Sequence, residues 1–259
     1  MDRPEDHKLR RSGRCPHCNA KLESKILAST RNLLEQFERS PNMTVSFFFN
    51  GHKGDTKDNG VKNPTGELRP TWMFSNFAQI PVSVQNPHNG VVLPFASAEA
   101  AFQAGKYLSR QDIISDLQVA YKGGECRKIA RRFKSSNVSG WIKHGLNVKW
   151  MRVVTYCKFL QCENLRSILM QTGERRLVED SPFDSFWGIG KDRKGTNMLG
   201  VILMEIRAQF LQDACTNALG EVHPETSAVI QGSAVRKGFV AAYTDFKKTR
   251  VKCLTGELQ

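Results

Sequence analysis

The stretch SAEAAFQAGKY, Ser97 to Tyr107, predicts a helix and carries the first indication of a site. Ser97 can cap free backbone N–H groups at a helix start, and Glu99 places a negative charge in the first turn, where it suits the helix dipole. Small and apolar residues recur at helical spacing, which predicts one buried face made of Ala98, Ala101, Phe102, Gly105 and Leu108.

A second stripe on this helix is polar. Glu99, Gln103 and Lys106 follow one another at i, i+4 and i+7. A stabilising Glu–Lys pair needs a spacing of three or four residues, whereas the two ends of this stripe lie about 10 Å apart along the axis. Two interpretations stay open: an ordinary amphipathic helix, or an acid, an amide and an amine that face one small ligand.

Composition limits the class of protein. The chain has 259 residues, is 40% hydrophobic and carries a formal net charge of +13, which suits one large domain with appendages. Such a charge favours a polyanionic partner, most commonly nucleic acid, although a generally basic surface is the alternative. The seven cysteines lack disulfide-like spacing, and no apolar signal segment or membrane span is visible. We therefore expect free thiols and an intracellular protein of the cytoplasm or nucleus, with no membrane contact.

The organisation along the chain has three parts. We expect a basic N-terminal arm over residues 1–43, a folded domain over 44–212 and a C-terminal extension over 213–259, which ends in a basic, loose tail. The arm contains Cys15-x-x-Cys18, which resembles half of a zinc ribbon. A structural zinc needs four ligands and no second CxxC appears, so free thiols are the competing interpretation and we assign no metal site.

The domain itself reads as α+β and mainly α-helical, with a few short strands. A buried strand is expected over 44–50, a loop or insertion over 51–70, and two short strands joined by an Asn-rich turn within 73–95. From 97 to 212 the periodicity is mostly helical, interrupted by a short strand at 175–180.

Several common catalytic motifs are missing from the sequence. It has no GxGxxG after a strand, no Walker loop, no HExxH and no GxSxG elbow. Rossmann and P-loop nucleotide enzymes and serine hydrolases are therefore disfavoured. The remaining reactive groups are carboxylates, lysines, amides and a tryptophan.

The stretch from Leu177 to Gly200 contains the second group of candidates. Glu179 ends an apolar strand, Asp184 lies in a loop with a proline, and Trp187 offers a flat surface for stacking a base. The alternative is a structured loop with a core tryptophan.

The same stretch continues with glycines and an asparagine. Gly188 and Gly190 would let the backbone approach a ligand closely. Asn197 is expected to cap the following helix, whose free N–H groups favour an anion such as phosphate.

Taken together, these residues resemble the NADAR family, also called the YbiA-like N-glycosidases, from about Ser46 to Phe210. The resemblance is specific because its pieces occur in the family's order: FSNF at 74–77, SAEAAFQAGK at 97–106, Trp141, Met151, KF at 158–159, TGERRLVEDSPFDSFWGIG at 172–190 and GTNMLGVILMEIR at 195–207. Two departures stand out. The loop from His52 to Arg69 looks longer than usual, and both termini lie outside the match.

The resemblance implies a compact, largely helical fold and cleavage of the bond between a ribose C1 and an exocyclic amine, with no cofactor. It also implies one of two substrates: ADP-ribose attached to the guanine amino group in DNA or nucleotides, or phosphoribosylamino-pyrimidine intermediates of riboflavin synthesis. The net charge of +13 favours the guanine substrate. A non-catalytic reader of ADP-ribose or nucleic acid is the third hypothesis, and a clustered acid and amine argue against it.

The expected chemistry starts from the glycosylamine, whose ring can open to an imine. Lys106 is then the candidate nucleophile that forms a Schiff base at C1, helped by a pKa that partial burial lowers. Glu99 or Asp184 would supply the proton and activate water. In the alternative mechanism, two carboxylates flank an oxocarbenium-like centre and Lys106 only binds phosphate or ribose.

Substrate binding is expected to involve further residues of the matched motifs. Asn76 and Gln103 would bind ribose hydroxyls, and Trp187 would stack on the base. Lys158 either contacts phosphate or lies on a helix surface. The remaining residues expected to bind substrate are Phe77, Glu179, Gly188, Gly190 and Asn197.

Overall fold

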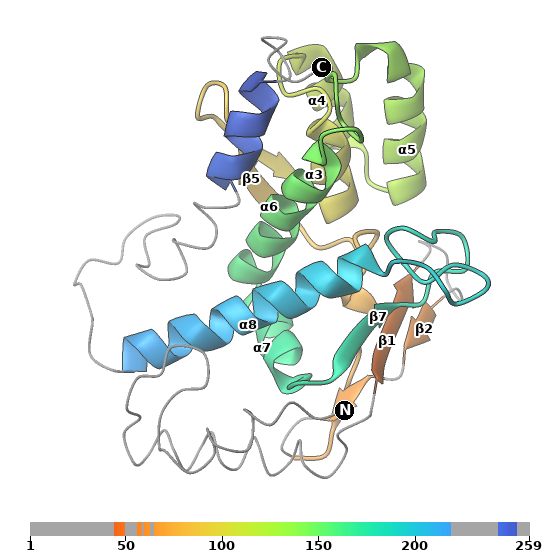
Figure 1. Ribbon diagram of the computed structural model, residues 1–259, viewed down its shortest axis with the longest axis vertical. Coiled ribbons are helices and arrows are strands. Elements are labelled where there is room, and N and C mark those ends of the chain that lie inside the picture. Colours follow the sequence, from red (N-terminus) through yellow and green to blue (C-terminus); the bar gives the residue numbers. More distant parts are fainter. Residues whose placement is uncertain (1–43, 50–55, 59, 63–64, 219–242, 253–259) are drawn as a thin grey trace.

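A computed structural model describes residues 44–49, 56–58, 60–62, 65–218 and 243–252. Helices dominate it and its strands are short, so the predicted α+β, mainly helical fold is confirmed (Figure 1). Three cysteines with described side chains, Cys126, Cys157 and Cys162, are free thiols as expected. Cys15 and Cys18 lie outside the described residues.

The main sheet joins the start of the domain to its last third. In the described residues its order is β2 (Thr56–Asp58), β1 (Thr44–Phe49), β7 (Arg176–Glu179). Strand β1 runs parallel to β7, with Phe47 opposite Glu179. The predicted strands at 44–50 and 175–180 are thus confirmed, and the pairing places Glu179 at the carboxyl end of β7.

Two small hairpins accompany the sheet. The predicted pair within 73–95 is confirmed as β5 (Val82–Gln85) and β6 (Val92–Phe95), which pair antiparallel. The segment predicted as a loop over 51–70 instead contains β2 together with β3 (Val61–Lys62) and β4 (Leu68–Arg69). That prediction was wrong because strands of two or three residues are too short to show an alternating pattern.

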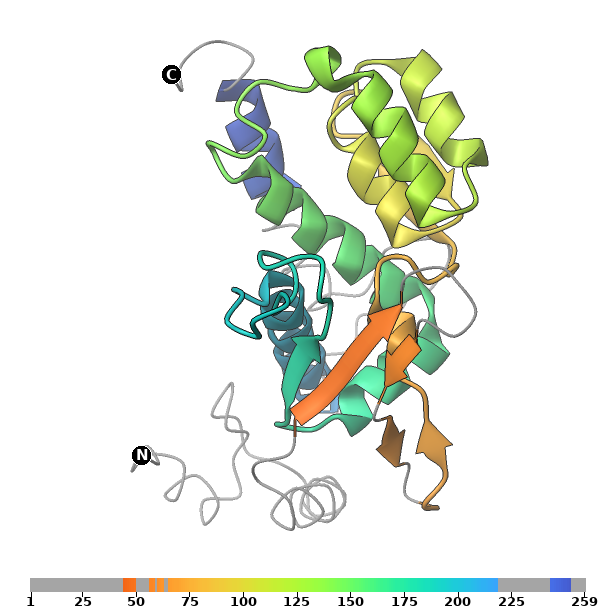
Figure 2. The same cartoon turned by 90° about the vertical axis from the view of Figure 1, so that its right-hand side faces the viewer.

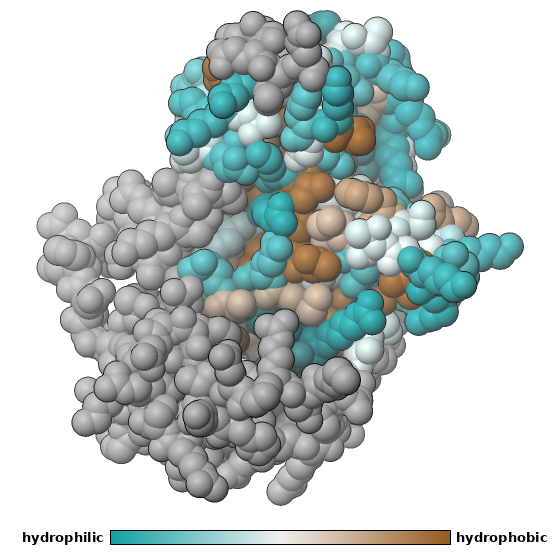
Figure 3. Space-filling model, viewed as in Figure 1, coloured by the Kyte–Doolittle hydropathy of each residue, from teal (hydrophilic) through white to brown (hydrophobic). Residues whose placement is uncertain are grey.

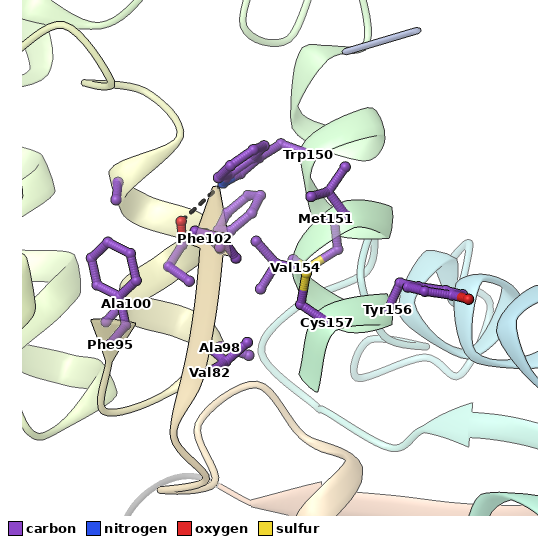
Figure 4. Close-up of a cluster of buried hydrophobic side chains, with 14 of the residues drawn as sticks. Val82, Phe95, Ala98, Ala100, Phe102, Trp150, Met151, Val154, Tyr156 and Cys157 are labelled. Carbon is purple, nitrogen blue, oxygen red and sulfur yellow. Dashed lines mark hydrogen bonds between the residues drawn. The ribbon is translucent and has the colours of Figure 1, made fainter. Parts of the chain in front are cut away.

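The helices form the larger part of the domain. In chain order they are η1 (Trp72–Phe74), α3 (Ala98–Ala104), α4 (Gln111–Val119), α5 (Gly123–Arg132), η2 (Lys134–Ser136), α6 (Leu146–Gln161), α7 (Glu163–Gln171) and α8 (Met198–Ala218). Helix α6 is central: it packs against α3, α7, α8 and β5. Figure 4 shows side chains of α3, α6 and the β5–β6 hairpin meeting in one apolar cluster, where Trp150 Nε1 donates to the Ala101 carbonyl at 2.9 Å.

Helix α3 is enclosed on every side. Ser97 caps it as predicted, since its hydroxyl accepts the Ala100 N–H at 3.3 Å. The polar residues Glu99 and Gln103 are buried together with the apolar face. The interpretation as an ordinary amphipathic helix with a solvated polar face is therefore wrong.

The chain returns to the domain near its C-terminus. Residues 243–252 form a helix, and Phe246 and Arg250 on it are 0% and 2% exposed. The described part of the tail predicted to be loose is therefore helical instead, because Phe246, Thr249 and Arg250 share one helical face that packs on the domain.

The surface of the described residues is mainly polar on one face, where Figure 3 shows apolar side chains gathered near the middle. Within the described ranges, no helix has both the length and the apolar character needed to cross a bilayer.

Candidate active site

A cavity of about 410 Å³ opens between α3, α5 and the loop that follows β7. Its wall brings together two thirds of the residues predicted from the sequence: Asn76, Phe77, Glu99, Gln103, Lys106, Glu179, Asp184 and Trp187. The other four, Lys158, Gly188, Gly190 and Asn197, do not line it.

The polar stripe of α3 forms a continuous hydrogen-bonded row along this cavity. Gln103 Nε2 donates to Glu99 Oε1 at 2.8 Å, and Lys106 Nζ donates to Gln103 Oε1 at 2.6 Å. One amide thereby spans the gap between an acid and an amine that are too far apart to pair directly. The acid, amide and amine face one cavity, as the second interpretation of the stripe required.

Lys106 lies at the turn that ends α3 and is half-buried. Burial lowers the pKa of its amine, and the charge of Arg127 lowers it further, while Glu99 opposes both. The direction agrees with the expectation from the sequence. A larger share of this amine is therefore neutral, and so nucleophilic, than for an exposed lysine.

Glu99 has a second neighbour that the sequence did not indicate. Arg127 Nε lies 3.5 Å from Glu99 Oε1, and the same guanidinium lies over the ring of Phe77, 4.4 Å from its centroid. The buried carboxylate is thus held by a cation and an amide, which orients it as an acceptor.

Glu179 stands apart from this row, although it lines the same cavity. It is 6% exposed, and its Oε2 atom has no hydrogen-bond partner. Burial raises the pKa of this carboxyl to about 8, although the charge of Lys158 opposes the shift. At neutral pH Glu179 is therefore mainly a protonated acid facing the cavity, where a substrate atom could accept its proton.

Asp184 and Trp187 shape the loop at the cavity wall. Asp184 Oδ1 accepts the N–H groups of Phe186 and Trp187 at 2.9 and 2.8 Å, so much of this carboxylate's bonding capacity orders the loop. Trp187 packs edge-on against Phe102, with ring centroids 5.5 Å apart. Its half-buried indole is fixed in place on the wall.

Gly188 and Gly190 serve the loop's own packing. A Cβ atom at Gly188 would lie 2.7 Å from the Glu179 carbonyl, and Gly190 has a φ of +69°. The expectation that these glycines admit a ligand is not met, because the groups they approach belong to the chain itself.

Asn197 does not cap α8 with its side chain. Its Oδ1 accepts the Glu179 N–H at 2.9 Å and its Nδ2 donates to the Leu177 carbonyl at 2.8 Å, so it ties α8 to β7. The N–H groups of Met198 and Leu199 donate to loop carbonyls, both at 3.0 Å. The predicted anion site at this helix start was wrong, since those donors are already used.

Lys158 is 0% exposed, which excludes both the phosphate contact and the helix surface predicted for it. Its Nζ donates to three successive carbonyls: Met73 at 2.7 Å, Phe74 at 3.3 Å and Ser75 at 2.8 Å. Burial lowers the pKa of this amine to about 7. Lys158 anchors the η1 turn directly before Asn76 and Phe77, which line the cavity.

Comparison with known families decides the identity of the domain. The model of the NADAR domain matches residues 62–211, which is more than half of the chain. The chain belongs to the NADAR family.

Several relatives of this NADAR domain are similar over much of their length. It is 32% identical over 144 residues to an N-glycosidase of Nostoc punctiforme, covering 55% of this chain and 87% of that one. It is 36% identical over 142 residues to the N-glycosidase YbiA of Escherichia coli, covering 53% and 80%. The NMR structure of E. coli YbiA aligns with a TM-score of 0.47 at 24% identity, over 71% and 95% of the two chains.

A third relative is much longer than the matched region. The chloroplastic riboflavin biosynthesis protein PYRR of Zea mays is 32% identical over 148 residues. The match covers 53% of this chain and only 23% of the maize protein.

The NADAR cavity also contains cations that sequence reasoning missed: Arg127, Arg131 and Lys134. Their spacing along α5 and η2 places them near one face, but basic residues at this spacing are equally typical of a solvated helix. Only the fold shows that this face borders the cavity.

Proposed function

We propose that this NADAR domain is an N-glycosidase that hydrolyses the bond between ribose C1 and an exocyclic base amine. The observation that carries the proposal is the row Glu99–Gln103–Lys106 with Glu179 facing the same cavity. The two relatives named N-glycosidases support it.

In the proposed mechanism the glycosylamine opens to an imine at C1: the bond from C1 to the ring oxygen breaks, and the proton lost from the glycosidic N–H passes to that oxygen. The neutral amine of Lys106 adds to C1, and the bond from C1 to the base nitrogen breaks as Glu179 donates its proton to that nitrogen. The base leaves as a free amine, and a Schiff base joins C1 to Lys106. Water then adds to C1 and releases the sugar, which restores the amine.

The alternative mechanism needs no covalent lysine. Two carboxylates would flank an oxocarbenium-like centre, and Lys106 would bind a ribose hydroxyl or phosphate. Borohydride separates the two mechanisms, because it reduces a Schiff base to a stable adduct whose position peptide mapping identifies.

We propose guanine-linked ADP-ribose, in DNA or nucleotides, as the substrate. The cations Arg127, Arg131 and Lys134 on the wall suit a pyrophosphate, and Trp187 suits a base. Riboflavin intermediates are the second candidate, favoured by the names of the maize relative and of a Vibrio vulnificus riboflavin biosynthesis protein, 30% identical over 197 residues.

Parallel assays test the substrate. The protein is incubated with a guanine-ADP-ribosylated nucleotide and, separately, with a phosphoribosylamino-pyrimidine, and the two values of kcat/KM are compared. Release of ADP-ribose and unmodified guanine at the higher rate is the expected result. Turnover of the pyrimidine alone would select the second candidate, and tight ADP-ribose binding without turnover of either would identify a reader.

The outer side of α5 supports nucleic acid as the form in which the guanine is presented. Lys128 and Arg132 are exposed on the helix that borders the cavity. Replacing both with Gln should flatten the dependence of log KM on log salt for a modified single strand, by about 0.7 for each lost phosphate contact, and leave a mononucleotide unaffected. Gln at both Lys143 and Lys248, which are exposed elsewhere, is the matched control; equal slopes in both double variants would contradict this binding surface.

A further inference from the structure

The backbone around Lys106 is held by several distant parts of the chain. Its carbonyl groups accept hydrogen bonds from three of them: Gly105 from Arg250 Nη1 at 3.1 Å, Lys106 from Val138 N at 3.1 Å and Leu108 from Asn86 Nδ2 at 2.9 Å. The peptide that carries the candidate nucleophile is therefore fixed on both sides.

Arg250 belongs to the helix over 243–252, which lies beside the start of α6 in Figures 1 and 2. The ring of Phe246 packs on Trp150 with centroids 4.7 Å apart. Lys149 Nζ donates to Asp245 Oδ1 at 2.9 Å and to Thr249 Oγ1 at 2.7 Å. Apolar and polar contacts together seat this helix on α6.

Two groups contact the peptide at Gly105. The Trp150 indole approaches so closely that a Cβ atom at Gly105 would overlap it. The Arg250 guanidinium, 2% exposed, donates to the Gly105 carbonyl and also, through Nε, to His88 Nε2 at 2.8 Å. The hydrogen bond to His88 thus orients the guanidinium, which in turn holds the Gly105 carbonyl.

We propose that the helix over 243–252 is a positioning element for catalysis and that Arg250 fixes the backbone of Lys106 through the Gly105 carbonyl. The helix lies outside the NADAR match over 62–211, so the family model does not account for it. The catalytic consequence rests on the proposed function, in which Lys106 attacks C1. A displacement of a reacting group by about 1 Å can lower a rate about 100-fold, so a loosened peptide should lower kcat.

Replacing Arg250 with Met tests the proposal, because Met keeps most of the volume and removes the donors. We expect a folded protein whose kcat falls about tenfold while KM changes less than twofold, since Arg250 does not line the cavity. Arg250→Lys should recover part of kcat, because an ammonium can donate to the same carbonyl. Lys248→Met, exposed on the same helix, is the matched control and should keep the wild-type kcat.

A second measurement does not depend on turnover. Lys106 is labelled with a limiting amount of an amine-acylating reagent, and mass spectrometry compares its labelling rate with that of exposed Lys143. We expect Arg250→Met to change the Lys106 rate at least threefold and leave Lys143 unchanged. If the wild type turns over no substrate, the proposed function fails, and this measurement still tests the positioning.

Two results would overturn the proposal. One is a folded Arg250→Met protein with both kcat and Lys106 labelling within twofold of wild type. The other is an equal loss of kcat in Lys248→Met. Should Arg250→Met not fold, Phe246→Leu provides the same test, because it loosens the docking of the helix on Trp150 and should change both readouts in the same direction.

Discussion

Lys106 lies in the turn that ends α3 and Lys158 lies on α6, which packs against α3. Both amines lose hydration, yet their surroundings differ. Lys158 Nζ donates to three carbonyls, which uses all three hydrogens of an ammonium group. Among the described residues, Lys106 Nζ donates one hydrogen bond, to Gln103, and faces the cavity. Burial lowers the pKa of both amines, so a lowered pKa alone does not identify a nucleophile. Bonding capacity left unused beside a cavity is the more informative property.

The largest expected effect separates the two lysines by activity. Lys106→Met should lower kcat about 10⁴-fold, because it removes the nucleophile, while the free energy of unfolding changes by less than about 1 kcal/mol. Borohydride should trap the sugar on wild type but not on this variant. A folded Lys106→Met protein with a near-normal rate would falsify the covalent route, and trapping on another lysine would mean that a different amine attacks.

The next effect concerns the Glu179 carboxyl, which lines the same cavity as Lys106. Glu179→Gln should lower kcat about 100- to 1000-fold, since the amide cannot donate an acidic proton. In wild type, kcat should rise as Lys106 loses its proton and fall as the pH passes about 8 and Glu179 ionises. The alkaline fall should be missing from Glu179→Gln. Asp184→Asn is the comparison variant: a larger loss there, with the alkaline fall retained in Glu179→Gln, would move the acid role to Asp184.

Replacing Lys158 should lower the stability of the fold and leave the chemistry at Lys106 intact, which is the opposite of what we expect for Lys106. Lys158→Met removes three hydrogen bonds to the η1 turn, where the Ser75 carbonyl keeps the Ala78 N–H at 3.1 Å. The loss should cost about 3 kcal/mol of unfolding free energy in urea titrations. Because the folded pKa of about 7 lies below the unfolded 10.5, the unfolded chain binds more protons between these values. Wild-type stability should therefore gain from this group as pH rises from 7 to 10.5, and Lys158→Met should lack that gain. In the folded fraction of Lys158→Met, borohydride should still trap the sugar on Lys106.

The smallest effect tests the bridge that connects Lys106 to Glu99. Gln103→Leu keeps a similar volume and removes both hydrogen bonds, so kcat should fall about tenfold as the amine loses its orientation. The exposed Gln111→Leu on α4 is the control. A rate within twofold of wild type would show that the row is not needed for catalysis.

Local sequence patterns were sufficient to predict those parts of the site that depend on a single helix or strand. Ser97 as a cap, the spacing of Glu99, Gln103 and Lys106, and the buried strand ending at Glu179 all follow from neighbours in sequence. These predictions agree with the structure because capping and helical periodicity act within a few residues.

The predictions that failed depend on distant partners. The acceptors of Lys158 lie more than 80 positions earlier in the chain, and the Asn197 side chain bonds to β7 rather than to its own helix. The spacing of residues within α6 or α8 cannot predict those partners, because they lie on other elements. The raised pKa of Glu179 likewise follows from burial that only the assembled fold creates. The boundaries at 43/44 and 212/213 stay predictions.

The parallel pairing of β1 with β7 has a consequence for the order of folding. Thr44 pairs with Arg176, so β1 gains this neighbour only after most of the domain, up to β7, has been synthesised. Contacts between such distant residues require closure of a long loop and slow the folding of a domain. On the ribosome, the apolar strand around Phe47 is therefore made long before its partner and needs protection from aggregation, and the cavity wall that contains Glu179 is completed late.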